Sequence, residues 1–208
     1  MIRFAAFCLV ALIQLPAVAG TFNQVVNIGD EMPDFTHLPS TWGAPVSASD
    51  YSDYDVLVLV SLANHCPWSN GADGDTSELA RQFADQNVAF LGFSVSHREE
   101  DKLPAMIEHA EQADYPFNFL YDESQELGRA LGATATPEYF VYNSDRELVY
   151  TGLLHNSPAT NRGGSLRYTE GEPTDHYVRD AIQATLEGEE VAVKETQSFG
   201  CVVEYVQS

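Results

Sequence analysis

The feature that most constrains this chain is an apolar run, Val56 to Val60, that leads through a short polar turn to Cys66 and Pro67. Alternating valine and leucine with no polar residue is typical of a strand that is buried on both faces. Proline is well tolerated in the first turn of a helix, because the N–H groups of that turn have no partner within the helix. The sequence therefore predicts a buried strand that ends shortly before Cys66 and a helix that follows it.

This position would give the sulfur of Cys66 a particular chemistry. Unpaired backbone N–H groups and the positive end of a helix dipole both stabilise a negative charge. The thiolate that they favour is the form of cysteine that attacks disulfides and peroxides. We therefore expect Cys66 to be exposed and reactive. A buried, inert cysteine at the end of a strand is the alternative.

The remaining pattern predicts an α/β fold. Residues 88–95 form a second apolar run, and the helical spacing at residues 77–86 supplies the crossover that parallel strands require. Residues 155–175 show no periodicity and predict a long loop. Further helices are expected at 103–113, 124–132 and 174–188, and further strands at 118–121, 138–142 and 147–154. This order favours a three-layer sandwich, in which helices flank a central mixed sheet.

The first nineteen residues have the pattern of a secretory signal peptide. Arg3 is their only charge, an apolar stretch spans residues 4–15, and Ala17-Val18-Ala19 is a small-residue cleavage site. The apolar stretch is too short to span a bilayer as a helix, and an ordinary buried helix is the alternative. We therefore expect residues 20–208 to be one exported domain, periplasmic or secreted. No membrane contact is expected after removal of the signal, and a C-terminal extension is expected from about residue 189.

The net charge of the chain limits the classes of partner that we expect it to bind. Ten lysines and arginines stand against 31 aspartates and glutamates, which gives a formal net charge of −21. A surface with this balance repels phosphate backbones and anionic membranes. Nucleic acid is therefore not an expected partner of this acidic protein.

Four stretches of the sequence form a recognisable set: Gly29 to Phe35 (GDEMPDF), Leu62 to Ser69 (LANHCPWS), Thr136 to Glu138 (TPE) and Gly200-Cys201. These stretches resemble the thioredoxin superfamily, and in particular its redoxin branch of alkyl hydroperoxide reductases, thiol-specific antioxidant enzymes and peroxiredoxin-like proteins. They follow the family order over nearly all of the chain after residue 28. The resemblance implies a thioredoxin-like fold and a thiol-dependent oxidoreductase with antioxidant activity and without a cofactor. Its substrate would be a peroxide or a protein disulfide, and an external thiol would reduce it again.

The resemblance also implies roles for individual residues. Cys66 would be the nucleophile, Ser69 stands where dithiol members carry a second cysteine, and His65 could assist by its charge when protonated. Thr136-Pro137 resembles the cis-proline loop that faces the cysteine in this superfamily. The residues expected to contact the substrate are Trp68, Thr136 and Pro137.

The chain departs from the family pattern at three points. Peroxidases of this kind carry threonine or serine three residues before the reactive cysteine, where this chain has Ala63. No arginine is placed as their active-site arginine is, since Arg146 falls in a predicted hairpin turn. The second cysteine of the dithiol members is missing. Cys201 could replace it by condensing with an oxidised Cys66. A permanent Cys66–Cys201 disulfide, or a Cys201 that never approaches Cys66, are the alternatives.

Two further hypotheses complete the sequence analysis. No metal site is expected, because no pair of potential ligands shows the spacing of a metal motif. These potential ligands are His65, Cys66, His97, His109, His155 and His176. The second hypothesis for function is a non-catalytic thioredoxin-like binding module, with structural cysteines and a partner-binding loop at residues 155–175.

Overall fold

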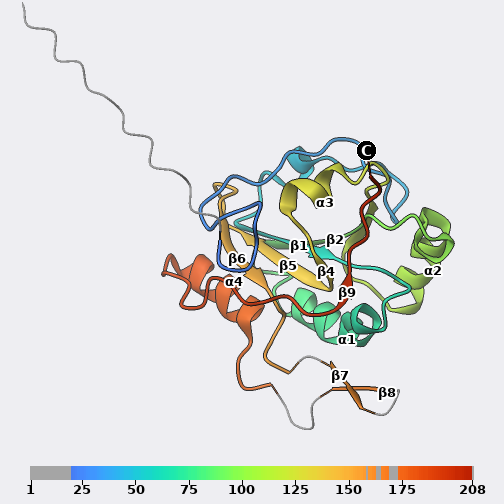
Figure 1. Ribbon diagram of the computed structural model, residues 1–208. Coiled ribbons are helices and arrows are strands. Elements are labelled where there is room, and N and C mark those ends of the chain that lie inside the picture. Colours follow the sequence, from blue (N-terminus) through green and yellow to red (C-terminus); the bar gives the residue numbers. More distant parts are fainter. Residues whose placement is uncertain (1–19, 158, 163–164, 169–172, 208) are drawn as a thin grey trace, which may run out of the picture.

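The computed structural model describes residues 20–157, 159–162, 165–168 and 173–207, so the expected signal peptide lies outside the described residues. A five-stranded sheet with strand order β3-β2-β1-β5-β6 forms its centre (Figure 1). The strands are β1 (Val56–Ser61), β2 (Val88–Ser94), β3 (Asn118–Tyr121), β5 (Glu138–Tyr142) and β6 (Leu148–Gly152). Strands β1, β2 and β3 run parallel, whereas β5 is antiparallel to both β1 and β6. The mixed sheet that the sequence predicts is confirmed.

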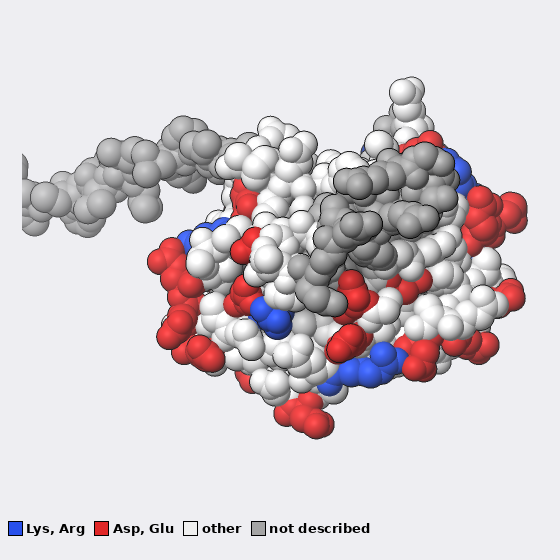
Figure 2. Space-filling view, turned by 90° about the horizontal axis from the view of Figure 1, so that it is seen from below, with Lys and Arg blue, Asp and Glu red and all other residues white. Residues whose placement is uncertain are grey.

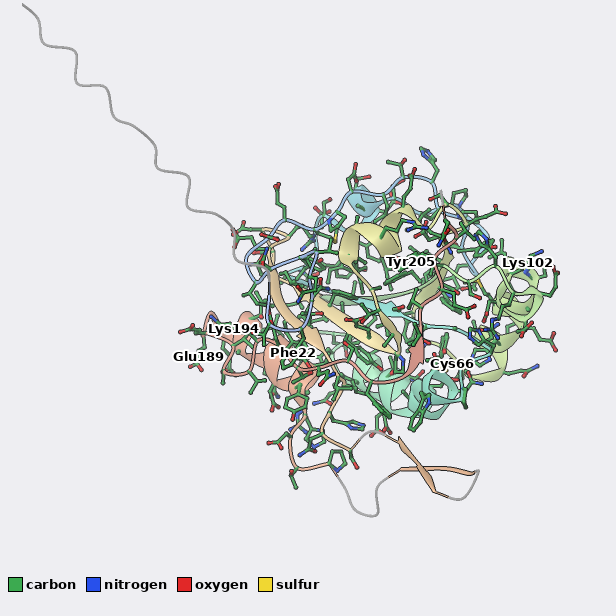
Figure 3. All side chains as sticks on the ribbon, viewed as in Figure 1. Phe22, Cys66, Lys102, Glu189, Lys194 and Tyr205 are labelled. Carbon is green, nitrogen blue, oxygen red and sulfur yellow. The ribbon has the colours of Figure 1, made fainter. Side chains whose placement is uncertain are left out.

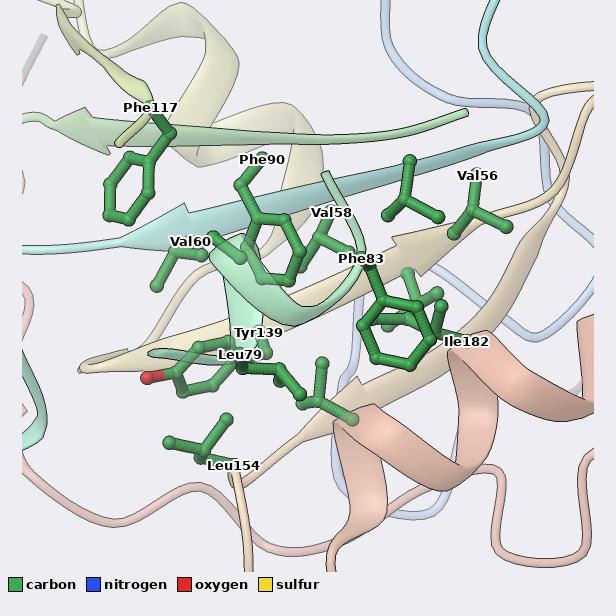
Figure 4. Close-up of a cluster of buried hydrophobic side chains, with 14 of the residues drawn as sticks. Val56, Val58, Val60, Leu79, Phe83, Phe90, Phe117, Tyr139, Leu154 and Ile182 are labelled. Carbon is green, nitrogen blue, oxygen red and sulfur yellow. The ribbon is translucent and has the colours of Figure 1, made fainter. Parts of the chain in front are cut away.

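Strand β1 separates two hydrophobic cores. Successive side chains of a strand point to opposite faces of its sheet, and all six residues of β1 are buried. Val56, Val58 and Val60 pack into one core, and Leu57 and Leu59 pack into the other. Figure 4 shows the first of these cores, in which side chains from strands and helices meet.

Helices cover both faces of the sheet and form the outer layers of the predicted sandwich (Figure 1). Side chains of α1 (Pro67–Gln82) and α4 (Tyr177–Glu187) belong to the first core, as do those of α2 (Leu103–Gln112), which lies next to β3. Side chains of α3 (Glu126–Leu131) belong to the second core. Two short 3₁₀ helices, η1 (Ala48–Tyr51) and η2 (Glu99–Asp101), lie in connecting segments.

The helix that the sequence predicts after Cys66 is present, but the helical spacing at residues 77–86 misplaces both of its ends. Helix α1 begins at Pro67 rather than near residue 77, and it ends at Gln82. The buried face of its first turns consists of the small side chains Ser69, Ala72 and Thr76, which produce no hydrophobic periodicity. The start of the helix therefore leaves little trace in the sequence beyond the proline.

Two other predictions also need correction. The helix expected at residues 124–132 begins at Glu126, because Gln125 is its N-cap residue, and the hydroxyl of Ser124 accepts a hydrogen bond from the N–H of Glu126. Residues 155–175 are not a featureless loop, because β7 (Ala159–Arg162) and β8 (Ser165–Tyr168) pair as antiparallel strands. These two strands consist mostly of polar residues, so the sequence shows no clear alternation of apolar and polar side chains. The two glycines between them are typical of a hairpin turn and could have indicated the pair.

A third pair of strands joins distant parts of the chain. Strand β4 (Ala135–Thr136) pairs in antiparallel fashion with β9 (Cys201–Val202) near the C-terminus. In Figure 1 the C-terminal segment crosses the front of the molecule from α4 to β9 and continues past α3. The extension that the sequence predicts after residue 189 is therefore packed against the domain.

The carboxylate of Glu138 holds the segment that contains β4. Its oxygen Oε2 accepts hydrogen bonds from the backbone N–H groups of Thr134 and Ala135, at 2.7 and 3.2 Å, and from the hydroxyl of Thr134. Ser198, in the C-terminal segment, also lies close to this carboxylate. One buried group thus positions both segments that meet at β4.

The surface carries the acidic character of the sequence. On the face shown in Figure 2, red acidic side chains are spread over the surface and blue basic side chains are few. Over the described part of the chain, none of the helices combines the length and the apolar character that a membrane crossing requires.

Replacing Leu59 by alanine tests the central position of β1. Leu59 is 0 % exposed, so the loss of its side chain leaves a cavity that should cost about 2–5 kcal/mol of unfolding free energy. Urea unfolding measures this cost. The control Val193→Ala removes methyl groups from a residue that is 44 % exposed and should change the stability by no more than about 0.5 kcal/mol. Equal effects of the two substitutions would contradict the assignment.

Replacing Glu138 by glutamine gives a pH signature. Burial raises the pKa of Glu138, because ionisation costs more in the folded than in the unfolded chain. Its contribution to stability is therefore largest at low pH and is lost as the pH rises through the raised pKa. Glutamine does not titrate. We expect the unfolding free energy of the wild type, relative to Glu138→Gln, to fall between about pH 4 and about pH 7. Urea unfolding at both pH values measures this, and a difference that grows with pH would refute it.

Candidate active site

Cys66 occupies the junction between strand and helix that the sequence predicts. Strand β1 ends at Ser61, helix α1 begins at Pro67, and Cys66 is the N-cap residue of the helix. The backbone N–H of Ser69 donates to the sulfur of Cys66 at 3.4 Å. The sulfur therefore lies at the positive end of α1, where a negative charge is stabilised.

Ser69 contributes to the site through its backbone. Its side chain is buried, and its hydroxyl oxygen accepts a hydrogen bond from the N–H of Ala63 at 3.2 Å. Ser69 contacts the sulfur of Cys66 through its backbone N–H group, while its hydroxyl bonds to Ala63. Ser69 thus ties the end of the β1 segment to the first turn of α1.

The loop of Thr136 and Pro137 faces Cys66. The peptide bond between the two residues is cis, as expected. The thiol of Cys66 donates a hydrogen bond to the carbonyl oxygen of Thr136, with 3.1 Å between sulfur and oxygen. The hydroxyl of Thr136 is buried without a hydrogen-bond partner.

Cys201 reaches the same place from the other end of the chain. It lies directly opposite Thr136 in the pairing of β9 with β4. Its thiol lies beside that of Cys66, and the backbone N–H of Trp68 is also close to it. Both cysteines are free thiols in the structure. The structure therefore brings together the two cysteines of residues 20–208, although 134 residues separate them in the sequence.

The two thiols differ in their surroundings. Burial raises the pKa of Cys201, and the neighbouring Cys66 raises it further. The N–H of Trp68 and the charge of Arg98 act in the opposite direction but are weaker. Cys201 therefore keeps its proton near neutral pH.

The prediction that Cys66 is exposed was wrong. Its exposed fraction is 0 %, because residues 198–206, here called the C-terminal strap, lie over it. Figure 3 shows Cys66 at the start of α1 beside β9, with Tyr205 farther along the same strap. Within the strap, Phe199 meets Trp68 edge to face, with 4.7 Å between the ring centres.

Asp101 is a residue of this region that sequence analysis missed. Its carboxylate is fully buried and accepts a hydrogen bond from the ring Nδ1–H of His65 at 2.5 Å. It also accepts the backbone N–H of His65 at 3.1 Å. The carboxylate therefore fixes the position of His65 and leaves Nε2 as the free ring nitrogen. A single aspartate within an acidic stretch gives no motif by which the sequence could have revealed it.

The structure contains a large cavity away from the two cysteines and a small one beside them. One of about 640 Å³ is lined by residues of the turn between β5 and β6 and of the segment after α4, and it includes no residue of the cysteine site. Another of about 20 Å³ is bounded by His65, Thr136 and Val202, which is enough space for one molecule of about the size of water. Among the described residues, no three histidine, cysteine, aspartate or glutamate side chains gather as metal ligands.

Two solved structures share both the fold and a detectable part of the sequence. An uncharacterized conserved protein from Geobacillus kaustophilus is 28% identical with a TM-score of 0.80, over 94% of this chain and 100% of that protein. A hypothetical protein from Sinorhizobium meliloti is 25% identical with a TM-score of 0.78, over 91% of this chain and 100% of that protein.

A more distant structure has a described class. Peroxidoxin BcpB from Mycobacterium tuberculosis is 18% identical with a TM-score of 0.52, over 77% of this chain and 94% of that protein. At this identity the likeness shows the thioredoxin-like fold alone.

No curated protein sequence matches the chain. The sequence model of the Redoxin family matches residues 27–163. Since this match spans more than half of the sequence, the chain belongs to the Redoxin family.

Proposed function

We propose that this protein is an exported, thiol-dependent oxidoreductase that cycles Cys66 and Cys201 between two thiols and one disulfide. The observation that carries the proposal is that both thiols lie at Thr136: Cys66 bonds to its carbonyl oxygen at 3.1 Å, and Cys201 pairs with it across β4 and β9. Cys66 is the nucleophile and Cys201 is the resolving cysteine. Export rests on the pattern of residues 1–19.

The cycle begins with the oxidation of Cys66. The Cys66 thiolate attacks a hydroperoxide, so that a sulfur–oxygen bond forms, the oxygen–oxygen bond breaks and an alcohol or water leaves with a proton. The product is a sulfenic acid at Cys66. The thiol of Cys201 then attacks this sulfur, which forms the Cys66–Cys201 disulfide and releases water.

A protein disulfide as oxidant leads to the same product. Cys66 attacks one sulfur of the substrate and forms a mixed disulfide, and Cys201 then displaces the substrate as a dithiol. In either case an external dithiol reduces the Cys66–Cys201 disulfide and is itself oxidised. Ala63 replaces the hydroxyl residue of the related peroxidases, so both oxidants belong in the assay.

The complete burial of Cys66 favours a second candidate, a binding module in which a Cys66–Cys201 disulfide is structural. The two candidates differ in how the bond responds to reductants. A structural disulfide resists reduction by cellular thiols, whereas a catalytic disulfide is reduced and formed again in each cycle.

Serine substitutions distinguish these roles. Cys66→Ser should lower the consumption of hydroperoxide, or of a protein disulfide, to the uncatalysed rate, because no other residue supplies the nucleophile. Cys201→Ser should stop turnover at the sulfenic acid, which mass spectrometry detects as an adduct with a sulfenic acid probe. Cys8→Ser is the matched control, because Cys8 lies in the expected signal peptide, and it should leave turnover unchanged. A disulfide that a thioredoxin system does not reduce, together with no turnover of either oxidant, would overturn the proposal in favour of the binding module.

A further inference from the structure

The strap occupies a position where a separate polypeptide could bind. Strand β9 pairs Cys201 with Thr136 and Val202 with Ala135, and the N–H of Val203 donates to the carbonyl of Thr134 at 3.0 Å. An exposed strand edge can bind an extended peptide through main-chain hydrogen bonds of this kind. In this chain the edge of β4 is already filled by the chain itself.

The fit of the strap over the cysteine depends on Gly200. A Cβ atom at Gly200 would lie 2.0 Å from the carbonyl oxygen of Thr136, far inside van der Waals contact. This is the carbonyl that accepts the thiol of Cys66. Only a residue without a side chain lets the strap pass this close to the site.

Firm contacts hold the chain on both sides of this crossing. Upstream, Thr196 bonds to the backbone of Thr151 and, through its hydroxyl oxygen, accepts the N–H of Leu153. Downstream, the hydroxyl of Tyr205 donates to the carbonyl of Ala133 at 2.8 Å, and Arg129 lies over the Tyr205 ring at 4.6 Å. These contacts of Thr196 and Tyr205 fix the chain before and after residues 197–204, here called the crossing segment.

The outward side chains of the crossing segment contribute little to holding it. Val202 is 78 % exposed and Phe199 is 48 % exposed. Glu204 pairs with Arg98 at 3.2 Å, with both side chains largely in solvent, and such a surface pair contributes little. The segment is therefore held mainly by its backbone, which pairs with β4 and accepts a hydrogen bond from the Gln125 side chain at the carbonyl of Glu204, at 3.1 Å. Opening the segment breaks these bonds while Thr196 and Tyr205 keep their contacts.

We propose that residues 197–204 are an internal occupant of the β4 edge, and that a partner polypeptide reaches Cys66 by displacing them. The partner is an extended segment that adds to β4 as β9 does, with its reactive cysteine opposite Thr136 in the place of Cys201. The proposal rests on the proposed function for the identity of this partner. The competition for the β4 edge can be measured without any turnover.

The test compares two glycine substitutions in the full chain that carries Cys201→Ser. Gly200→Ala places a methyl group against the Thr136 carbonyl, whereas Gly74→Ala, the matched control, adds the same group where no atom lies within 4 Å. The rate at which iodoacetamide alkylates Cys66 is followed by mass spectrometry of its peptide. Gly200→Ala should increase the rate by about tenfold or more, because it raises the population of the open segment, and Gly74→Ala should leave it unchanged.

A peptide tests the second half of the proposal. Added to the Gly200→Ala protein, a synthetic peptide with the sequence of residues 198–204 and serine in place of its cysteine should slow the alkylation of Cys66 again. Phe199→Ala is a second opening variant, which removes only the contact with Trp68. It keeps the test decisive if circular dichroism shows that Gly200→Ala does not fold.

The outcomes separate this proposal from the proposed function. Unchanged alkylation in the folded opening variants, or an equal increase in Gly74→Ala, would overturn the gating by residues 197–204. Failure of the peptide to protect Cys66 would overturn the β4 edge as a docking site. Faster alkylation with peptide protection, but no turnover of any oxidant, would support the competition for β4 and reject the oxidoreductase.

Discussion

The burial of strand β1 on both faces is the constraint on which the rest of the structure depends. Because its side chains alternate between two cores, a shift of one residue would reverse every contact, and the strand has one register. This register places Cys66 at the start of α1. It also sets Ser61 opposite Glu138 of β5, which brings the preceding Thr136 and Pro137 to the same end of the sheet. The site is thus assembled by the pairing of two central strands.

The parts of the fold that sequence analysis predicts are those with strong local patterns. Strands β1, β2, β3 and β5 consist mostly of apolar and aromatic residues, and their positions agree with the prediction to within a residue or two at each end. The apolar spacing of the helix after Cys66 is visible only from residue 77, because its first buried residues, such as Ser69 and Thr76, are small or polar. Pattern analysis detects bulky apolar side chains, and it misses a helix that packs closely through small ones.

The sequence pointed to several residues of the candidate site, but it did not reveal the burial of Cys66 or the carboxylates that position the surrounding segments. Cys66, Thr136 and Cys201 carry recognisable motifs, so their association was a reasonable hypothesis. The burial of Cys66 depends on a segment that is distant in the sequence and forms only a two-residue strand. Asp101 and Glu138 each act through a lone buried carboxylate, and a lone acidic residue has no distinguishing pattern among 31 acids. Such non-local features require the folded chain.

The location of the two cysteines also has a consequence for the durability of the protein. A covalent bond between Cys66 and Cys201 would close a ring of chain that contains most of the domain, from α1 to β9. Because a cross-link restricts the unfolded chain more strongly as its ring grows, a ring of this size would raise the unfolding free energy by about 5 kcal/mol. Oxidation would then make the protein hardest to denature, and reduction would leave it most vulnerable to heat and proteases.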